Sequence, residues 1–102
     1  MEMFSGLDWD DGNRTKCQKH GVSIEEIEQL FRTAPFVGRD ETHSELEDRY
    51  IAVGRTGAGR SLLVIYTLRS RDGVELVRPV SARYMHRKEV QWYEEEAAKD
   101  HN

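Results

Sequence analysis

The sequence is poor in the features that mark disulfide-bonded and membrane-spanning proteins. Its single cysteine, Cys17, can form neither an internal disulfide nor a multi-thiolate metal site, which suits a reducing compartment. The longest apolar run, residues 62–66, is too short to cross a bilayer, and the first residues lack the basic start and apolar stretch of a secretory signal. We therefore expect a cytoplasmic protein in which Cys17 either packs as a small hydrophobic side chain or takes part in catalysis.

Motifs of several common catalytic sites are absent as well. The four histidines stand far apart, without a pair at helix spacing or a thiolate partner, so we expect no metal and no other cofactor. Gly57 and Gly59 fall in a predicted hairpin turn and do not open a helix, as the glycines of a phosphate-binding loop do. The Gly-x-Ser-x-Gly elbow of serine hydrolases is missing too. Histidine, lysine, arginine and glutamate remain as the residue types that can carry acid–base and phosphate chemistry.

Length and charge indicate one domain with a basic central block. The 102 residues fit a single compact domain, 1–102, with a frayed end at 99–102. The net charge of −4 is unevenly distributed, since residues 1–48 hold 5 basic and 12 acidic residues, residues 49–93 hold 9 and 3, and residues 94–102 hold 1 and 4. Eight of the nine basic residues in the central block are arginines, which bind phosphate through two parallel hydrogen bonds. This block either binds a phosphate-rich partner or is a set of exposed strands that carry arginines.

Two helices are predicted in the first third of the chain. A strand over 3–9 precedes a helix over about 10–20, which an aspartate caps and a glycine stops. Ser23 and Glu26 have the spacing of a capping box, so a second helix begins there, and it ends before Pro35.

The remaining sequence predicts an antiparallel sheet and a last helix. Strands are expected over residues 36–41, 50–54, 61–69 and 74–82, with a polar turn over 42–48. Asp72-Gly73 between apolar runs indicates a tight hairpin, and Pro79 places the last strand at an edge or in a bulge. A helix follows over about 85–98. The order β-α-α-β-β-β-β-α defines an α+β fold.

The basic and histidine side chains suit cleavage of RNA without a metal. A base takes the proton of a 2′-hydroxyl, an acid protonates the leaving 5′-oxygen, and cations stabilise the phosphate. Lys19 and His20, at the end of the first helix, are candidates, and Arg83 and Arg87, spaced one helical turn apart, are expected to grip one phosphate together. His20 alternatively serves only to complete the helix dipole.

Short motifs along most of the chain resemble those of the BrnT ribonuclease toxins. They are Trp9-Asp10 with Asn13, Lys19-His20-Gly21-Val22-Ser23, His43-Ser44-Glu45, residues 47–51, Gly54-Arg55, residues 64–67, Val80-Ser81-Ala82-Arg83, Arg87-Lys88-Glu89 and Tyr93-Glu94. The resemblance covers roughly residues 7–95. No single motif is specific, but Lys-His-Gly-Val early in the chain together with Ser-Ala-Arg before the last helix is specific as a combination.

The resemblance implies a RelE-like fold and an endoribonuclease that inhibits translation. It also implies neutralisation by a BrnA-like antitoxin, which binds operator DNA and represses the shared operon, so that contact with DNA is indirect. The matching positions are Lys19, His20, Glu45, Arg49, Ser81, Arg83, Arg87, Glu89 and Tyr93. Among these we expect His20, Glu89, Arg83 and Arg87 to be catalytic, and Lys19, Arg49, Arg83 and Arg87 to contact phosphate. Tyr93 either packs or stacks on a base, and Glu89 either transfers a proton or orients an arginine.

Some positions depart from the usual pattern of the family and leave other functions open. Residues 84–86 and 90–92 stand where basic residues are frequent, which removes positive charge near the expected RNA. The alternative is therefore a non-catalytic co-repressor, which binds the antitoxin and strengthens its hold on operator DNA. Phe36, Val37 and Trp92 are candidates for an exposed apolar patch that binds the partner, or else belong to the core.

Overall fold

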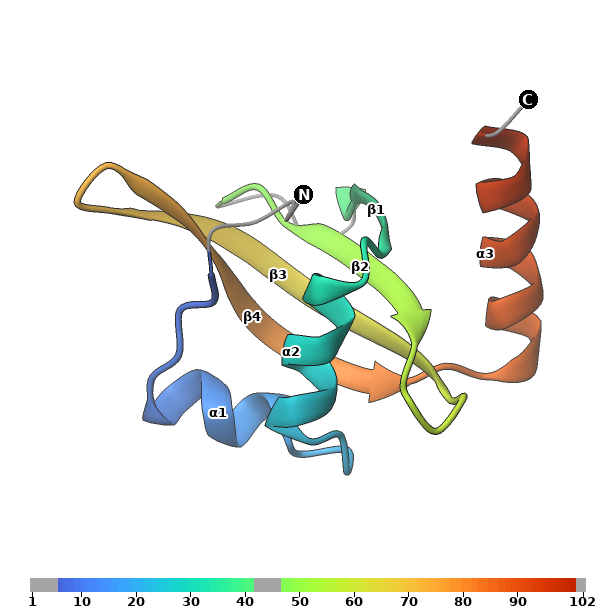
Figure 1. Ribbon diagram of the computed structural model, residues 1–102, viewed down its shortest axis with the longest axis horizontal. Coiled ribbons are helices and arrows are strands. Elements are labelled where there is room, and N and C mark those ends of the chain that lie inside the picture. Colours follow the sequence, from blue (N-terminus) through green and yellow to red (C-terminus); the bar gives the residue numbers. More distant parts are fainter. Residues whose placement is uncertain (1–5, 42–46, 101–102) are drawn as a thin grey trace.

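A single antiparallel sheet organises the computed structural model, which describes residues 6–41 and 47–100. Its elements are α1 (Asp11–Cys17), α2 (Ile24–Arg32), β1 (Phe36–Arg39), β2 (Tyr50–Arg55), β3 (Ser61–Arg71), β4 (Val74–Tyr84) and α3 (Arg87–Asp100). The strands lie in the order β1-β2-β3-β4 (Figure 1). The predicted α+β fold and antiparallel meander are thus confirmed. No helix in the described residues is long and apolar enough to cross a membrane.

Both N-terminal helices begin with reciprocal caps. The Ser23 side chain accepts a hydrogen bond from the Glu26 N–H, and Glu26 accepts one from the Ser23 N–H, which confirms the capping box. Asp10 and Asn13 form the same arrangement at α1. The chain then continues through a turn to residue 20, since the Lys19 N–H donates to a carbonyl only three residues back. The first helix is therefore shorter than predicted.

The predicted strand over 3–9 is wrong in its described part. Leu7 makes only an isolated bridge to Val77, with the Asp8 N–H donating to the Val77 carbonyl at 2.7 Å. Two residues along β4, the backbone next faces the sheet edge at Pro79. Proline has no N–H, so the pairing with the N-terminal segment cannot continue there. Instead, the Asn13 side-chain amide donates to the carbonyls of Asp8 and Pro79, each at 2.9 Å. Residues 3–5 lie outside the described residues, as do residues 42–46 of the predicted turn and Glu45 with them.

Strands β3 and β4 form a long hairpin with a bulge near its middle. Asp72 and Gly73 both have positive φ, at 52° and 79°, as the predicted tight turn requires. Tyr66 pairs with Pro79 and Ile65 pairs with Ser81, so Val80 is an extra residue on β4. Because β4 is also an edge strand, both expectations for Pro79 are confirmed.

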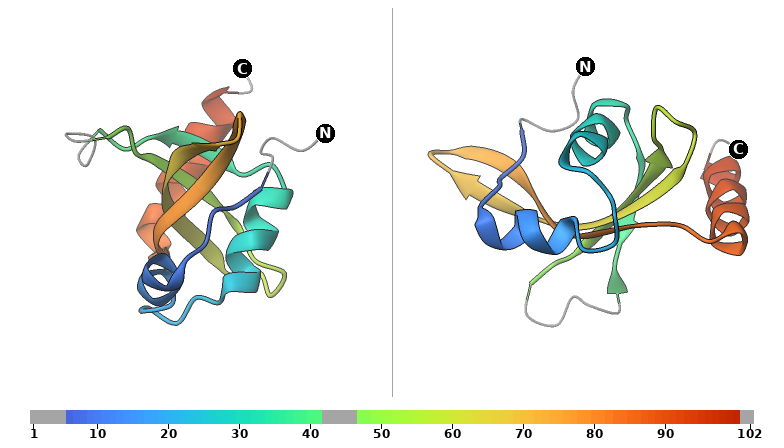
Figure 2. Two further views of the ribbon diagram at one scale, coloured as in Figure 1. Left: turned by 90° about the vertical axis from the view of Figure 1, so that its left-hand side faces the viewer. Right: turned by 90° about the horizontal axis from the view of Figure 1, so that it is seen from below.

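The core lies between one face of the sheet and the two N-terminal helices. It consists of Cys17, Val22, Ile27, Leu30, Phe31, Ala52, Leu62, Val64, Tyr66, Val77 and Ala82. Burial raises the pKa of Cys17 to about 11, so this thiol is protonated at neutral pH, which favours packing as its role. A β-carbon on Gly54 would lie 2.5 Å from Leu30 Cδ1, which explains the glycine. Helix α3 lies on the opposite side of the sheet from α2 (Figure 2).

Candidate active site

A hollow of about 300 Å³ lies on the sheet face that points away from α2, and we call it the Arg83 pocket. Its lining consists of His20, Asp40, Ile51, Leu63, Ile65, Ser81, Ala82, Arg83, Glu89 and Tyr93. The strands present Leu63, Ile65 and Arg83 to this face because their neighbours along the chain point into the core. The fold thus brings together four predicted site residues, His20, Arg83, Glu89 and Tyr93, from a turn, a strand and a helix.

The centre of the pocket is a bidentate ion pair between Arg83 and Glu89. The Arg83 Nη1 and Nη2 atoms lie 2.8 and 2.7 Å from the two Glu89 carboxylate oxygens. Glu89 also accepts a hydrogen bond from the His86 N–H at 3.0 Å, at the start of α3. The hydrogen bonds from Arg83 and then from His86 lower the pKa of Glu89 to about 2. Glu89 is therefore ionised at neutral pH, which favours the orientation of Arg83 over proton donation as its role.

Tyr93 forms the wall between the Arg83 pocket and a smaller apolar cavity. This cavity of about 180 Å³ lies beneath α3 and is lined by Phe36, Val53, Gly54, Arg55, Ser61, Met85, Val90, Tyr93 and Glu94. The Tyr93 ring meets Phe36 edge to face at a centroid distance of 6.0 Å, and partial burial raises its pKa. Tyr93 therefore packs against the sheet and also faces the pocket.

Three other predicted site residues do not line the pocket. Lys19 is exposed beside His20, and Arg87 is exposed at the first position of α3. The expectation that Arg83 and Arg87 lie one helical turn apart is wrong, because β4 continues to Tyr84 and only Arg87 is helical. Arg49 lines a separate groove described below.

Asp40, a buried carboxylate that lines the pocket, was not among the residues predicted from the sequence. The only hint is its position, since an acidic residue directly follows the short apolar strand β1. Its N–H donates to the Arg49 carbonyl at 2.8 Å, which carries the β1–β2 pairing beyond the end of β1.

The chemical groups of the pocket combine an oriented cation with groups that can exchange protons. They include an imidazole, a guanidinium, a serine hydroxyl, a phenol and the carboxylates of Asp40 and Glu89. Within residues 6–41 and 47–100, no three histidine, cysteine or acidic side chains gather as metal ligands.

Trp92 is the one exposed residue among the three apolar candidates for a partner surface. Its exposed fraction is 55%, whereas Phe36 and Val37 are half-buried. The Trp92 ring lies edge to face against the Tyr93 ring at a centroid distance of 4.7 Å.

Comparison with known proteins assigns the chain to a family. A search of curated proteins finds no match. The family model described as "Ribonuclease toxin, BrnT, of type II toxin-antitoxin system" matches residues 9–89. This match extends from Trp9 to Glu89, and it includes His20 and Arg83 of the pocket. The chain therefore belongs to the BrnT family of ribonuclease toxins of type II toxin–antitoxin systems.

Proposed function

We propose that this chain is a metal-independent endoribonuclease of the cytoplasm, which cleaves RNA and thereby inhibits translation. A BrnA-like antitoxin neutralises it. The observation that carries the proposal is the Arg83 pocket, where Glu89 fixes a guanidinium beside His20 and Ser81. A fixed guanidinium stabilises the charge that accumulates on phosphate during transfer, because its donors need no reorientation as the reaction proceeds.

In this mechanism Arg83 binds the scissile phosphate and His20 removes the proton of the adjacent 2′-hydroxyl. The 2′-oxygen forms a bond to phosphorus while the bond from phosphorus to the 5′-oxygen breaks. Water protonates the leaving 5′-oxygen, since Glu89, with its pKa of about 2, carries no proton at neutral pH. The products are a 2′,3′-cyclic phosphate and a 5′-hydroxyl end.

The test is cleavage of a synthetic RNA by the purified chain, with identification of the new ends. We expect Arg83→Ala and His20→Ala to lower the rate at least 100-fold. Arg32→Gln, an exposed change on α2 at the other face of the sheet, serves as the charge control and should leave the rate unchanged. Equal rates for the wild type and both pocket variants would refute the proposed site.

A second candidate function is the non-catalytic co-repressor, favoured by the same ion pair. Because Glu89 already occupies both terminal nitrogens of Arg83, the charge in the pocket is compensated. Expression in a bacterial host with and without the neighbouring open reading frame separates the two functions. Growth arrest and RNA cleavage that the neighbour suppresses support the nuclease. Normal growth, intact RNA and tighter operator binding by the antitoxin in the presence of this chain support the co-repressor.

A further inference from the structure

A second hollow, which we call the Arg69 groove, lies next to the Arg83 pocket on the same sheet face. It has a volume of about 230 Å³ and is lined by Gly12, Asn13, Lys16, Glu47, Arg49, Thr67, Arg69, Arg78, Pro79 and Val80. The paired residues Ile65 and Ser81 line the Arg83 pocket, and the next pair on that face, Thr67 and Arg78, lines the groove. The two hollows are therefore neighbours along β3 and β4.

Cations outnumber acidic residues in the described lining of the groove. Lys16, Arg49, Arg69 and Arg78 contribute cations, whereas Glu47 is the one acidic residue that the described lining contains. Arg69 lies on the long β3–β4 hairpin, beyond Tyr66, the last β3 residue paired with β2 in the described ladder (Figure 1). Lys16 comes from α1, so the groove joins two parts of the chain that are distant in sequence.

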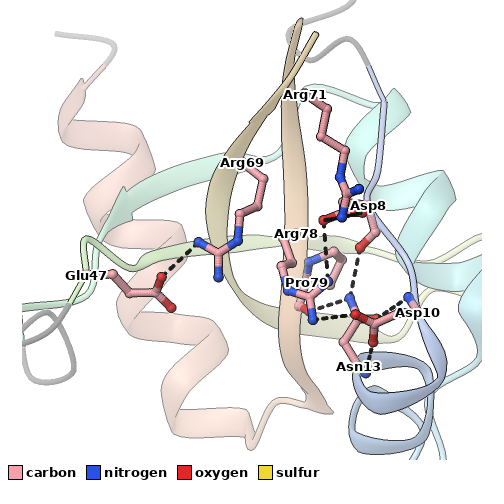
Figure 3. A network of polar contacts seen from close by, with 8 residues as sticks. All are labelled: Asp8, Asp10, Asn13, Glu47, Arg69, Arg71, Arg78 and Pro79. Carbon is pink, nitrogen blue, oxygen red and sulfur yellow. Dashed lines mark hydrogen bonds and ion pairs between the residues drawn. The ribbon is translucent and has the colours of Figure 1, made fainter. Parts of the chain in front are cut away.

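These cations are not equally available to a ligand. The Arg78 side chain is only 21% exposed and is fixed by Asp10 at 2.8 Å and Asp8 at 3.4 Å (Figure 3). Arg69 is 43% exposed and contacts Glu47 at 2.9 Å, apart from that cluster (Figure 3). Lys16 is exposed and makes no ion pair with any residue that the structure describes. Arg78 is thus structural, while Lys16 and Arg69 can turn toward a ligand.

Exchange of the Arg69 partner costs little free energy. Exposed ion pairs contribute little to stability because water screens them, and Glu47 also lies 3.9 Å from Arg49. A phosphate can replace the carboxylate on Arg69 and gain hydrogen bonds to a planar guanidinium. Arg78 and Arg83 pair with Thr67 and Leu63, which are four residues apart on β3, so Arg78 of the groove and Arg83 of the pocket lie roughly 13 Å apart along the sheet. That separation is several nucleotides of a single strand.

We propose that Lys16, Arg49 and Arg69 form a second phosphate subsite, which binds single-stranded RNA several nucleotides away from the scissile phosphate. The inference rests on the proposed nuclease function. It extends that proposal to the length of RNA that the chain binds. RNA fits better than an acidic protein segment because the groove neighbours the pocket along β3 and β4, and a nucleic acid presents phosphates continuously along such a path.

The test measures binding of 2′-O-methyl oligonucleotides, which lack the nucleophilic hydroxyl and are not cleaved. A 3-mer reaches only the Arg83 pocket, whereas a 12-mer spans both hollows. The Lys16→Gln/Arg69→Gln double variant should bind the 12-mer at least tenfold more weakly and the 3-mer as the wild type does. The slope of log affinity against log salt should fall by about 1.4 for the 12-mer, because two phosphate contacts are lost.

Two variants control for charge and for folding. Arg32→Gln removes one positive charge on the other sheet face and should leave the affinity for both oligonucleotides unchanged. Arg69→Lys keeps the charge and should retain most of the salt slope. Equal temperatures of unfolding for all variants show that the fold is intact.

The outcomes separate the subsite from the nuclease function. A 12-mer affinity and slope that match the wild type, in a chain that still cleaves RNA, would overturn the subsite alone. Unchanged 12-mer binding with weakened antitoxin binding would also overturn it, and would assign the groove to the partner protein. A wild-type chain that neither binds nor cleaves RNA would remove both proposals.

Discussion

Helix α1 and helix α3 both border the functional face, but they are attached to the sheet by different forces. Buried hydrogen bonds hold α1, since the Asn13 amide donates to two backbone carbonyls and Cys17 is fully buried. Helix α3 is attached through the Arg83–Glu89 and Arg55–Glu94 ion pairs and by the edge-to-face contact of Tyr93. The α1 side is therefore expected to be rigid, while α3, which contributes Glu89 to the pocket, has the weaker attachment.

The largest effect should come from the α1 side. Asn13→Ala removes the donor for the carbonyls of Asp8 and Pro79 and should lower the free energy of unfolding by about 2–4 kcal/mol. Urea denaturation measures the loss. Gln18→Ala, which removes one exposed hydrogen bond to the Arg14 carbonyl, is the matched control and should cost under about 0.5 kcal/mol. Similar losses for the two variants would contradict the claim that α1 is anchored by its buried amide.

Glu89→Gln should have a smaller effect on stability and a larger one on activity. The pair with Arg83 is partly exposed, so its loss should cost about 1 kcal/mol of unfolding free energy. Cleavage should fall at least tenfold, because the guanidinium is no longer held in place. Parallel measurements of unfolding and of the cleavage rate test this pair of effects, and an unaltered rate would exclude the positioning role.

The stability contributed by Glu89 should also depend on pH. Its folded pKa, about 2, lies below the ordinary glutamate pKa of 4.5, so the contribution is complete above about 4.5 and is lost as the pH falls toward 2. The difference in unfolding free energy between the wild type and Glu89→Gln should therefore shrink over this window. Urea titrations at pH 7, 4 and 2.5 measure it, and a constant difference would contradict the cause given for the lowered pKa.

The smallest effect should come from Glu94→Gln, which removes the exposed ion pair between α3 and Arg55. Arg55 and Glu94 are both more than half exposed, so the free energy of unfolding should change by less than about 0.5 kcal/mol. Hydrogen exchange of residues 92–100 should nevertheless be faster than that of α1 in the wild type. Slower exchange in this segment than in α1 would reverse the comparison.

Local signals in the sequence were sufficient for most elements of this fold. The capping box at Ser23, the Asp72-Gly73 turn and the bulge at Pro79 each depend on side chains within a few residues. The strand over 3–9 was mispredicted because its apolar pattern is local, while its failure to pair depends on Pro79, about 70 residues away. Such an interaction cannot be seen in a short window.

The candidate site was predictable by residue type and only partly by position. The family pattern selected His20, Arg83 and Glu89, and the fold brings all three to one pocket. Strand register places Arg49 in the separate groove and Asp40 in the pocket. Neither property follows from spacing along the chain.

The extra residue Val80 constrains how the length of β4 can change in evolution. Side chains of a strand alternate between faces, so the bulge inverts the phase of everything that follows it, and Arg83 points to the pocket while Ala82 and Tyr84 point to the core side. Deletion of Val80 would exchange those two sets and place a guanidinium in the apolar interior. A substitution in this strand leaves the alternation of side chains unchanged, so substitutions can accumulate one at a time. A single deletion would instead remove both the core packing and the arginine of the pocket.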